Sequence, residues 1–372
     1  MPLSIKEVEN KDDLYKFVKL PYILYKDDKN WVPYFIRDVI AYLDPEVNPE
    51  YKFCKVKLWY VTNNGELLGR IGGIINYKFN EKYGKKYGRV SRFECINDIN
   101  IANLLFATVE EWFKKEGMEY SIGPYGFSNF DNNGLLIKGF EYIPSIASTY
   151  NFDYYQIFFE KNNYEKLIDW LEFRLKIEDI PEKVLNLCNL VKEKYKVRVL
   201  SFKKKKDLLN YGEKIFKLIN VAFSNIFGFV ELDQELFEFY KNKYLKFIRQ
   251  EFVKVIVNEK DEVIAFIISN PSVSEALQKM NGKIFTTKIF HLVKTLKKPK
   301  VVDLLLTAVH PDYQEKGITS LLIFELQKTL REKRIEYAET TGILENNYKA
   351  INHWKNYSSI QHRIRRCYIK KI

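Results

Sequence analysis

The stretch LLLTAVHPDYQEKGIT, residues 304–319, is the most informative part of this chain. An apolar run typical of a buried strand ends at Pro311, and a short polar loop then leads into a helix predicted over 318–331. The N–H groups of such a loop and of the first helical turn point to one place, where the helix dipole adds partial positive charge. The stretch therefore predicts an anion site, of a size that suits a pyrophosphate, at the start of this helix.

Two residues of the loop strengthen this interpretation. Gly317 lets a phosphate approach the main chain because no Cβ stands in the way, and Lys316 adds a positive charge beside it. The alternative is an ordinary helix start after a turn, and the loop alone leaves both interpretations open.

A second informative segment is ENNYKA, residues 345–350. It follows a strand predicted over 337–341 and opens a helix predicted over 347–355. Asn347 is a good N-cap for that helix. An N-cap and a ligand contact are compatible roles for the same side chain.

Together the two segments resemble the GNAT superfamily of acetyl-CoA-dependent N-acyltransferases. There a Gln/Arg-x-x-Gly-x-Gly/Ala motif follows the fourth strand, and Gln314, Gly317 and Thr319 occupy its marked positions, with Thr319 departing from Gly or Ala. The superfamily's Glu-Asn-x-x-Ala segment is similar to Glu345–Ala350, in which Asn347 would either hydrogen-bond the pantetheine arm or order the splay of the fifth strand. The resemblance implies acetyl-CoA as a substrate held by Thr307, Ala308, Val309, Gln314, Glu315, Lys316, Gly317, Ile318, Thr319, Ser320 and Asn347.

The whole chain is similar to a bacterial GNAT-related family of about this size with two GNAT-like halves. The residues that carry this resemblance are Gly123-Pro124, Asn133–Leu136, Gly139-Phe140, Asn151, Tyr154-Tyr155, 220–230, 280–299 and 363–368. It implies an α/β fold, α+β mixed, of two tandem GNAT-like domains, each a twisted mixed sheet flanked by helices.

The superfamily mechanism implies direct attack of an amine on the thioester. Backbone N–H groups near 307–309 would polarise the carbonyl, and a general base would take the proton of the acceptor. Candidate bases are Asp303, Glu339 and His310; each also has a structural explanation, as a strand start, a buried strand residue and a turn cap. Trp354 stands where many members have a Tyr that protonates the leaving thiolate, and the indole N–H is only a hydrogen-bond donor. Tyr357 and Tyr348 are nearby substitutes.

The two halves repeat one order of elements: strand, two helices, three strands, helix, strand, helix, strand. The elements expected first are strand 4–8, helix 12–27 broken at Pro21, strands 56–62, 67–77 and 88–96, helix 98–117 and strand 120–123. Those of the second half are strand 197–202, helices 211–223 and 234–248, strands 252–257, 263–268 and 301–309, helix 318–331, strand 337–341, helix 347–355 and strand 361–371.

We predict a degenerate GNAT-like domain over 1–180 and an acetyl-CoA-binding GNAT domain over 197–372. Where the first half should have a phosphate loop it reads RFECINDI, residues 92–99, without glycine and with two acids. Its loop 123–139 could instead line an acceptor cleft between the halves. An insert over 274–300 is basic and amphipathic; we expect it to pack between the halves rather than to bind a membrane.

Composition limits the partners. The formal net charge is +12, which favours anionic partners but does not choose among nucleic acid, lipid and a phosphate-bearing cofactor. Basic clusters at 203–206, 294–300 and 362–371 are interpreted as solvated faces, because no nucleic-acid motif accompanies them. Four dispersed cysteines and four histidines give no metal-site spacing, so we expect no metal, buried free thiols and a cytoplasmic protein without a membrane span.

The sequence thus predicts an N-acyltransferase that moves an acetyl or other acyl group from acetyl-CoA to a primary amine, in a small molecule or a peptide. Two alternatives stay open: a transferase using aminoacyl-tRNA or a long acyl chain, and a non-catalytic sensor that binds acyl-CoA.

Overall fold

The computed structural model of the chain describes residues 3–244, 248–282 and 289–372. The first half contains β1 (Ser4–Glu7), α1 (Lys11–Leu24), α2 (Ile36–Tyr42), η1 (Pro49–Lys52), β2 (Cys54–Asn63), β3 (Glu66–Asn76), α3 (Tyr77–Tyr83), β4 (Tyr87–Cys95), α4 (Ile99–Lys115), β5 (Tyr120–Gly123), β6 (Leu135–Lys138), α5 (Tyr155–Lys161) and β7 (Glu165–Lys176). Helix α6 (Glu182–Lys194) joins it to the second half.

The second half contains β8 (Arg198–Ser201), α7 (Lys205–Leu209), α8 (Gly212–Phe223), α9 (Gln234–Tyr244), η2 (Gln250–Phe252), β9 (Val253–Val257), β10 (Val263–Pro271), α10 (Ser274–Met280), α11 (Ile289–Lys297), β11 (Val301–Val309), η3 (Pro311–Tyr313), α12 (Ile318–Glu332), β12 (Tyr337–Thr340), β13 (Ile343–Leu344), α13 (Tyr348–Trp354) and β14 (Ser359–Lys371). The repeated order of elements expected from the sequence is confirmed, with short additional elements in both halves. Residues 245–247, at the end of the helix expected over 234–248, lie outside the described part of the chain.

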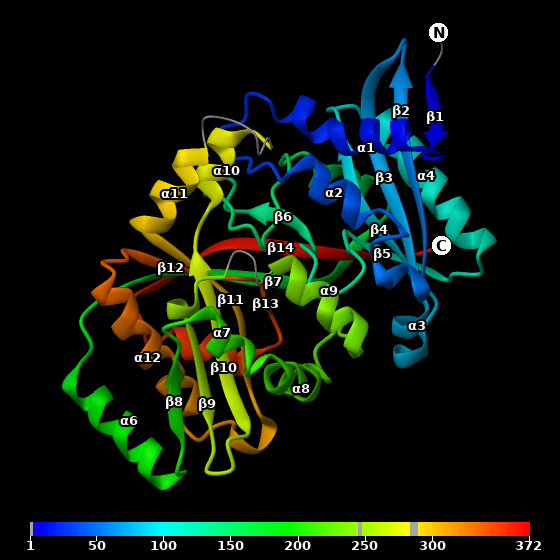
Figure 1. The fold of residues 1–372 in the computed structure, drawn as a ribbon. Helices are drawn as coiled ribbons and strands as arrows, with labels where there is room; N and C mark the ends of the chain where they lie inside the picture. Colours follow the sequence, from blue (N-terminus) through cyan, green and yellow to red (C-terminus); the bar gives the residue numbers. More distant parts are fainter. Residues whose placement is uncertain (1–2, 245–247, 283–288) are drawn as a thin grey trace.

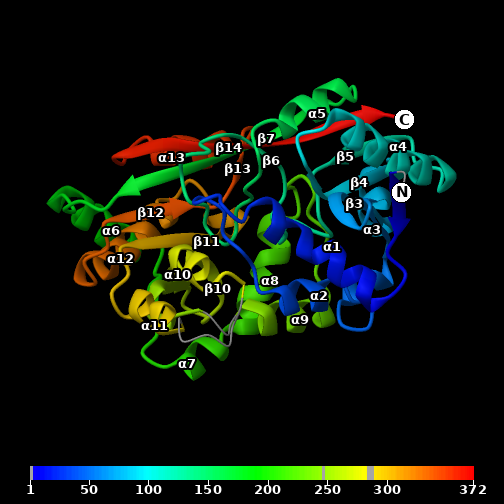
Figure 2. The same cartoon turned by 90° about the horizontal axis from the view of Figure 1, so that it is seen from above.

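All strands join one mixed sheet in the order β1-β2-β3-β4-β5-β14-β7-β12-β11-β10-β9-β8, with β6 and β13 beside this path. Helices cover both faces, as the view from above shows (Figure 2). α12 and α6 pack on one face of the second half and α8 and α9 on the other. No described helix has the length and apolar composition required to cross a membrane.

The two halves exchange their last strands. β7, from the first half, pairs with β12, and β14, from the second half, pairs with β5; β7 and β14 also pair with each other. Figure 1 shows β14 crossing from the second half into the first, so that the C-terminus lies beside the first half's strands. The sequence predicted two packed halves but not this exchange.

Pro21 does not end α1, contrary to the expected break. Its missing N–H leaves the carbonyl oxygen of Phe17 without its helical donor. Nη1 of the buried Arg70, on β3, donates to that oxygen at 2.8 Å. A tertiary contact therefore replaces the lost helical hydrogen bond, and the helix continues to Leu24.

The insert over 274–300 packs on the first half through α10, as expected. Leu277 is buried against Val32, and Ser274 Oγ donates to the carbonyl oxygen of Pro144 at 2.7 Å. From α11, Leu292 and Leu296 join the same cluster. Residues 283–288 of the insert lie outside the described part of the chain.

The terminal basic run 362–371 is not a solvated face at its start, and that interpretation was wrong. Arg363 is 0% exposed and Arg365 is 4% exposed, because β14 lies in the middle of the sheet. Both guanidiniums contact the buried carboxylate of Glu172 on β7, at 3.2 Å from Arg363 Nε and 2.6 Å from Arg365 Nε. Burial by itself raises the pKa of Glu172, but Arg365 and Arg363 hold it below its ordinary value.

We expect Glu172→Gln to lower the free energy of unfolding by about 3–5 kcal/mol at neutral pH, since it leaves two guanidiniums buried without their counter-charge. Because the folded-state pKa of Glu172 is lowered, its stabilisation is present above the unfolded-state pKa and is lost as pH falls through the folded-state value. Urea unfolding of both proteins between pH 8 and pH 3 measures this.

Glu165→Gln is the matched control, since Glu165 is exposed on the same strand. We expect its effect to stay within about 0.5 kcal/mol. The prediction is contradicted if both variants lose the same free energy of unfolding, or if the loss in Glu172→Gln does not become smaller in acid. Either result would show that the ion cluster around Glu172 does not stabilise the pairing of β7 with β14.

Candidate functional site

The strands β11 and β12 open away from each other at the predicted site. They pair in parallel only over Val301–Leu304 and Tyr337–Thr340. Beyond that point the chain turns aside, and β13 pairs with β7 instead. Residues 305–309 of β11 therefore lack a neighbouring strand on this side, and Thr307 is exposed along the opening.

A β-bulge lies at the start of this opening. The register between β10 and β11 steps from Ile268 opposite Leu306 to Ser269 opposite Leu304, so Leu305 is an extra residue. A bulge bends its strand and changes the direction of the backbone groups that follow. The predicted oxyanion residues Thr307, Ala308 and Val309 lie directly after it.

The loop after β11 leads into α12 as the sequence predicted. Gln314, Glu315 and Lys316 are exposed, and Glu315 and Gly317 have positive φ angles of 59° and 77°. Gly317 is the N-cap of α12 and provides no side-chain acceptor for the first-turn N–H groups. Ile318 is buried, so it can contribute only through its backbone, while Thr319 and Ser320 are half-buried.

The corresponding helix of the first half differs at this position. Asp98 caps α4, and its side chain accepts from the Asn100 N–H at 2.8 Å. A carboxylate thus occupies the place where a phosphate would bind and would repel it. Only the second half presents an open helix N-terminus here.

Helix α6 also contacts the loop. A Cβ added at Gly317 would lie 2.9 Å from Cγ2 of Val191, on α6. The absence of a side chain at this position therefore serves the packing of α6 as well as any approach of a ligand.

Helix α13 is tied to the same loop. Nζ of Lys349 lies 2.8 Å from Oε1 of Glu315, so the two sequence motifs are neighbours in space. Asn347 is exposed and accepts from the Ala350 N–H at 3.2 Å through Oδ1, which is the expected N-cap. Its contact with a pantetheine arm stays a prediction.

Two of the candidate bases lie side by side. Asp303 and Glu339 are register partners on β11 and β12, and they are 1% and 5% exposed. Oδ1 of Asp303 has no hydrogen-bond partner among the described residues. Burial, together with the Glu339 carboxylate, raises the pKa of Asp303 well above its ordinary value. Burial also raises the pKa of Glu339, against the opposing effect of Arg174.

The structure adds two residues that the sequence analysis missed. Arg174 donates from Nε to Oε1 of Glu339 at 2.7 Å, and Nε2 of the buried His362 lies 3.9 Å from Oε2 of Glu339. Burial lowers the pKa of His362 to about 4, so its imidazole is neutral at pH 7. No local signal marks these residues, because they come from β7 and β14 and meet Glu339 only through the strand exchange.

The other two catalytic candidates have structural contacts. His310 accepts from the Asp312 N–H at 3.3 Å and so caps η3. The hydroxyl of Tyr357 lies 3.5 Å from Nε2 of His353, and burial raises the pKa of Tyr357 to about 12. Its ring packs with Trp354 against the core that includes α6.

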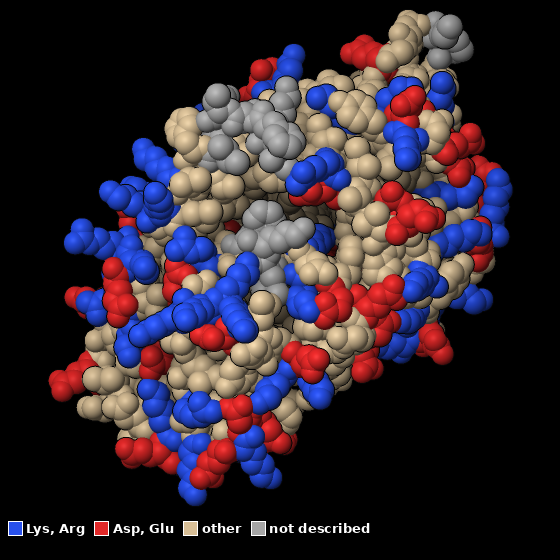
Figure 3. Space-filling view, in the orientation of Figure 1, with Lys and Arg blue, Asp and Glu red and all other residues tan. Residues whose placement is uncertain are grey.

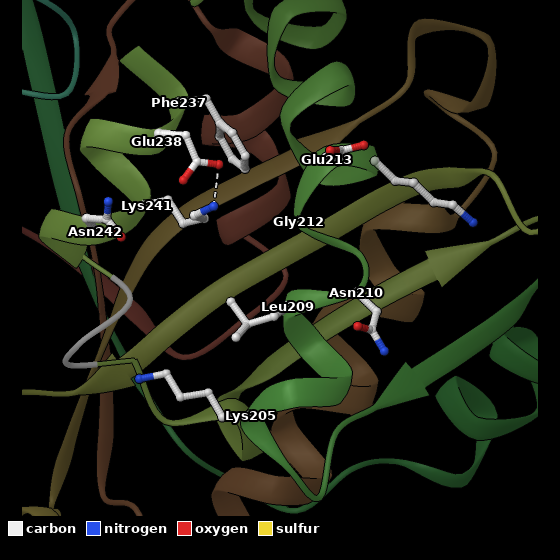
Figure 4. Close-up of a pocket in the computed structure, with 10 residues that line it drawn as sticks. Lys205, Leu209, Asn210, Gly212, Glu213, Phe237, Glu238, Lys241 and Asn242 are labelled. Atoms are coloured by element: carbon white, nitrogen blue, oxygen red, sulfur yellow. Dashed lines mark hydrogen bonds and ion pairs between the residues drawn. The ribbon is translucent and has the colours of Figure 1, made fainter. Parts of the chain in front are cut away.

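A surface pocket of about 670 Å³ lies elsewhere, between α7, α8 and α9 (Figure 4). Leu209 and Phe237 line it, with the side chains of Lys205, Glu213 and Lys241 around them. It shares no residue with the predicted donor site. Within the described ranges no group of His, Cys, Asp or Glu could hold a metal ion.

Comparisons with known proteins identify a family model and two bacterial relatives. Residues 213–357 match the model of the acetyltransferase (GNAT) family. The chain is 26% identical over 371 residues to Protein YghO of Escherichia coli, covering 98% of this chain and 94% of the relative. It is 24% identical over 388 residues to a bacterial ceramide synthase of Caulobacter vibrioides, covering 100% and 98%.

Solved structures share the fold at low sequence identity. A tandem GNAT protein from the clavulanic acid biosynthesis pathway superposes with a TM-score of 0.57 at 11% identity, covering 100% of this chain and 98% of its own. A GCN5-related N-acetyltransferase from Sphaerobacter thermophilus gives a TM-score of 0.54 at 9% identity, covering 99% and 95%. Residues 213–357 therefore match the GNAT acetyltransferase family, and the chain as a whole shares the fold of tandem GNAT proteins.

Proposed function

We propose that the protein is an N-acyltransferase that moves an acyl group from acyl-CoA to a primary amine. The observation that carries this proposal is in the second half: the bulged end of β11, which has no neighbouring strand on its β12 side, lies beside the open N-terminus of α12. The first half has a carboxylate cap at the equivalent helix and would bind no donor. A cytoplasmic location is part of the proposal, and it is supported by four buried free cysteines.

In this proposal each segment has one task. Backbone N–H groups of the loop and of the first turn of α12 bind the pyrophosphate, and those of 307–309 polarise the thioester carbonyl. Asp303 accepts the proton of the attacking ammonium, and Glu339 beside it sets the basicity of Asp303. Tyr357 or a water protonates the leaving thiolate.

The chain length of the acyl donor is a separate question. The relative named a bacterial ceramide synthase aligns over the whole chain. A ceramide is an amide of a fatty acyl chain with a long-chain amino alcohol. This similarity supports a second candidate function beside acetyl transfer. In it, the donor carries a long acyl chain and the acceptor is an amino alcohol.

We predict that acetyl-CoA raises the melting temperature of the protein. At a hundred times its dissociation constant, bound ligand adds about 2.7 kcal/mol to the free energy of unfolding. Gly317→Asp should abolish this shift, because it places a carboxylate beside the pyrophosphate. Differential scanning fluorimetry with acetyl-CoA and with a long-chain acyl-CoA measures both effects.

Gly317→Asn is the matched control. Both substitutions meet Val191 and the positive φ angle, and only Asp adds charge. A shift that survives in Gly317→Asp, or an equal loss in both variants, would remove the loop from the donor site.

We further predict that Asp303→Asn lowers the transfer rate by about two to four orders of magnitude while donor affinity is kept. In Glu339→Gln, the loss of the neighbouring negative charge lowers the pKa of Asp303, so the acid limb of the pH–rate profile moves to lower pH. Thiol release with an amine panel gives the rates, and the melt assay gives the affinities.

The same assays decide the remaining roles. His310→Gln and Tyr357→Phe should keep most of the activity if these side chains only cap η3 and fill the core. Full activity of Asp303→Asn would exclude it as the base. Tight donor binding without thiol release from any amine would favour the sensor function, which Trp354 suits.

A further inference from the structure

The ammonium group of Lys243 lies inside a cage of tyrosine rings. Its Nζ is 3.6 Å from the ring centroid of Tyr42, 5.2 Å from that of Tyr244 and 5.8 Å from that of Tyr240. Such distances are those of cation–π attraction. Among the described residues Lys243 forms no ion pair, so its ammonium group interacts mainly with the faces of these rings.

Both halves build this cage, and the hydroxyl of each ring has a hydrogen-bond partner. Tyr42, at the end of α2, donates to Oε2 of Glu50 at 3.1 Å. The hydroxyls of Tyr240 and Tyr244, on α9, contact Ser128 Oγ at 2.7 Å and the carbonyl oxygen of Phe130 at 3.0 Å. Each ring is thus fixed through its hydroxyl group, and its face is left for a cation.

The charges around the cage favour a cation. Glu50 is 1% exposed, and burial, with the nearby Asp131, raises its pKa to about 7. Burial lowers the pKa of Lys243, whereas Asp131, Glu50 and Asp38 oppose the shift and Arg92 adds to it. Lys243 therefore loses hydration in the cage without gaining a direct carboxylate contact.

The cage lies on the side of β11 opposite α12. Tyr240 packs in the same apolar cluster as Ala308, and Tyr244, Phe130 and Leu306 border it. Ile318 of α12 belongs to a different cluster, on the other face of the sheet. Helix α9, which carries Tyr240 and Tyr244, lies on the face of the molecule drawn in Figure 3. An acceptor that approached residues 306–308 from here would meet a donor bound on the α12 side.

We propose that the tyrosine cage is an entry subsite, where the acceptor binds as its ammonium and displaces Lys243 before it moves to Asp303, loses its proton and attacks the thioester. The inference rests on the proposed function and names its acceptor site. Lys243 shows in the chain itself that the cage takes an alkylammonium. The apolar side chains beside it suit an acceptor whose amine ends an alkyl chain.

Direct binding tests this without catalysis. Isothermal titration calorimetry with hexylamine as the probe should show binding to the parent protein, and hexan-1-ol, which has no charge, should bind more weakly. Lys243→Met removes the internal competitor, and we expect it to tighten hexylamine binding at least about threefold. Lys243→Arg keeps the cation and should leave the affinity near that of the parent.

The rings are tested in the same way. Tyr42→Leu should weaken hexylamine binding about three- to thirtyfold, while Tyr42→Phe keeps the ring and should bind as the parent does. Tyr244→Leu replaces Tyr42→Leu if the latter does not fold. Hexylamine affinity that is unchanged or weaker in Lys243→Met would overturn the cage as an amine site.

Donor binding is measured on the same preparations. The acetyl-CoA melting shift should persist in all these variants, since the loop 314–320 lies on the other face of the sheet. If hexylamine binds as predicted and no acyl-CoA binds, the proposed function fails and the amine site stands. If acyl transfer occurs and the cage variants leave amine affinity unchanged, the amine site fails and the proposed function stands.

Discussion

The pairing of β7 with β14 is the constraint on which the rest of this structure depends. It runs from Ser359 opposite Leu175 to Ile369 opposite Glu165 and joins two half-sheets into one. Because β13 pairs with β7, the chain after Thr340 is drawn away from β11, and the opening between the strands follows. The buried ions of the seam depend on the same pairing, since Glu172 and its two guanidiniums come from opposite halves. Separating the halves would leave buried charges without their partners, and an uncompensated buried charge costs several kcal/mol, about 3–5 for a broken pair.

The two halves have one architecture and differ in what fills the equivalent site. Both contain a bulge in the strand before the central helix: at Leu305 in β11, and near Arg92 in β4, where φ is 49°. In the first half Glu94, beside that bulge, accepts from the hydroxyl of Tyr25 at 2.6 Å, and Asp98 caps the next helix. In the second half Asp303 keeps an unpartnered carboxylate oxygen and Gly317 leaves α12 open. The first half thus uses its polar groups for structure, whereas the second leaves them available.

The sheet separates two environments that a transferase needs. The loop 314–320 and α12 lie on one face, with exposed backbone donors suited to phosphate. The tyrosine cage lies on the other, with aromatic rings and buried carboxylates suited to an amine. Between them, a row of polar side chains crosses the sheet from His362 through Glu339 to Asp303. Positive and negative side chains are interspersed over the face drawn in Figure 3.

The sequence by itself determined the local features. Apolar periodicity located the helices and strands, among them the strands expected over 56–62 and 67–77 and the helix expected over 98–117. The motif around Gly317 located the turn from β11 into α12, because a glycine in a strand-to-helix turn leaves a local pattern. Tertiary structure alone decided the strand exchange, the burial of Arg363 and Arg365, the continuation of α1 past Pro21 and the approach of Arg174 and His362 to Glu339. Each of these features depends on contacts between residues far apart in the chain. The sequence around a basic residue does not indicate whether its partner is water or a buried carboxylate.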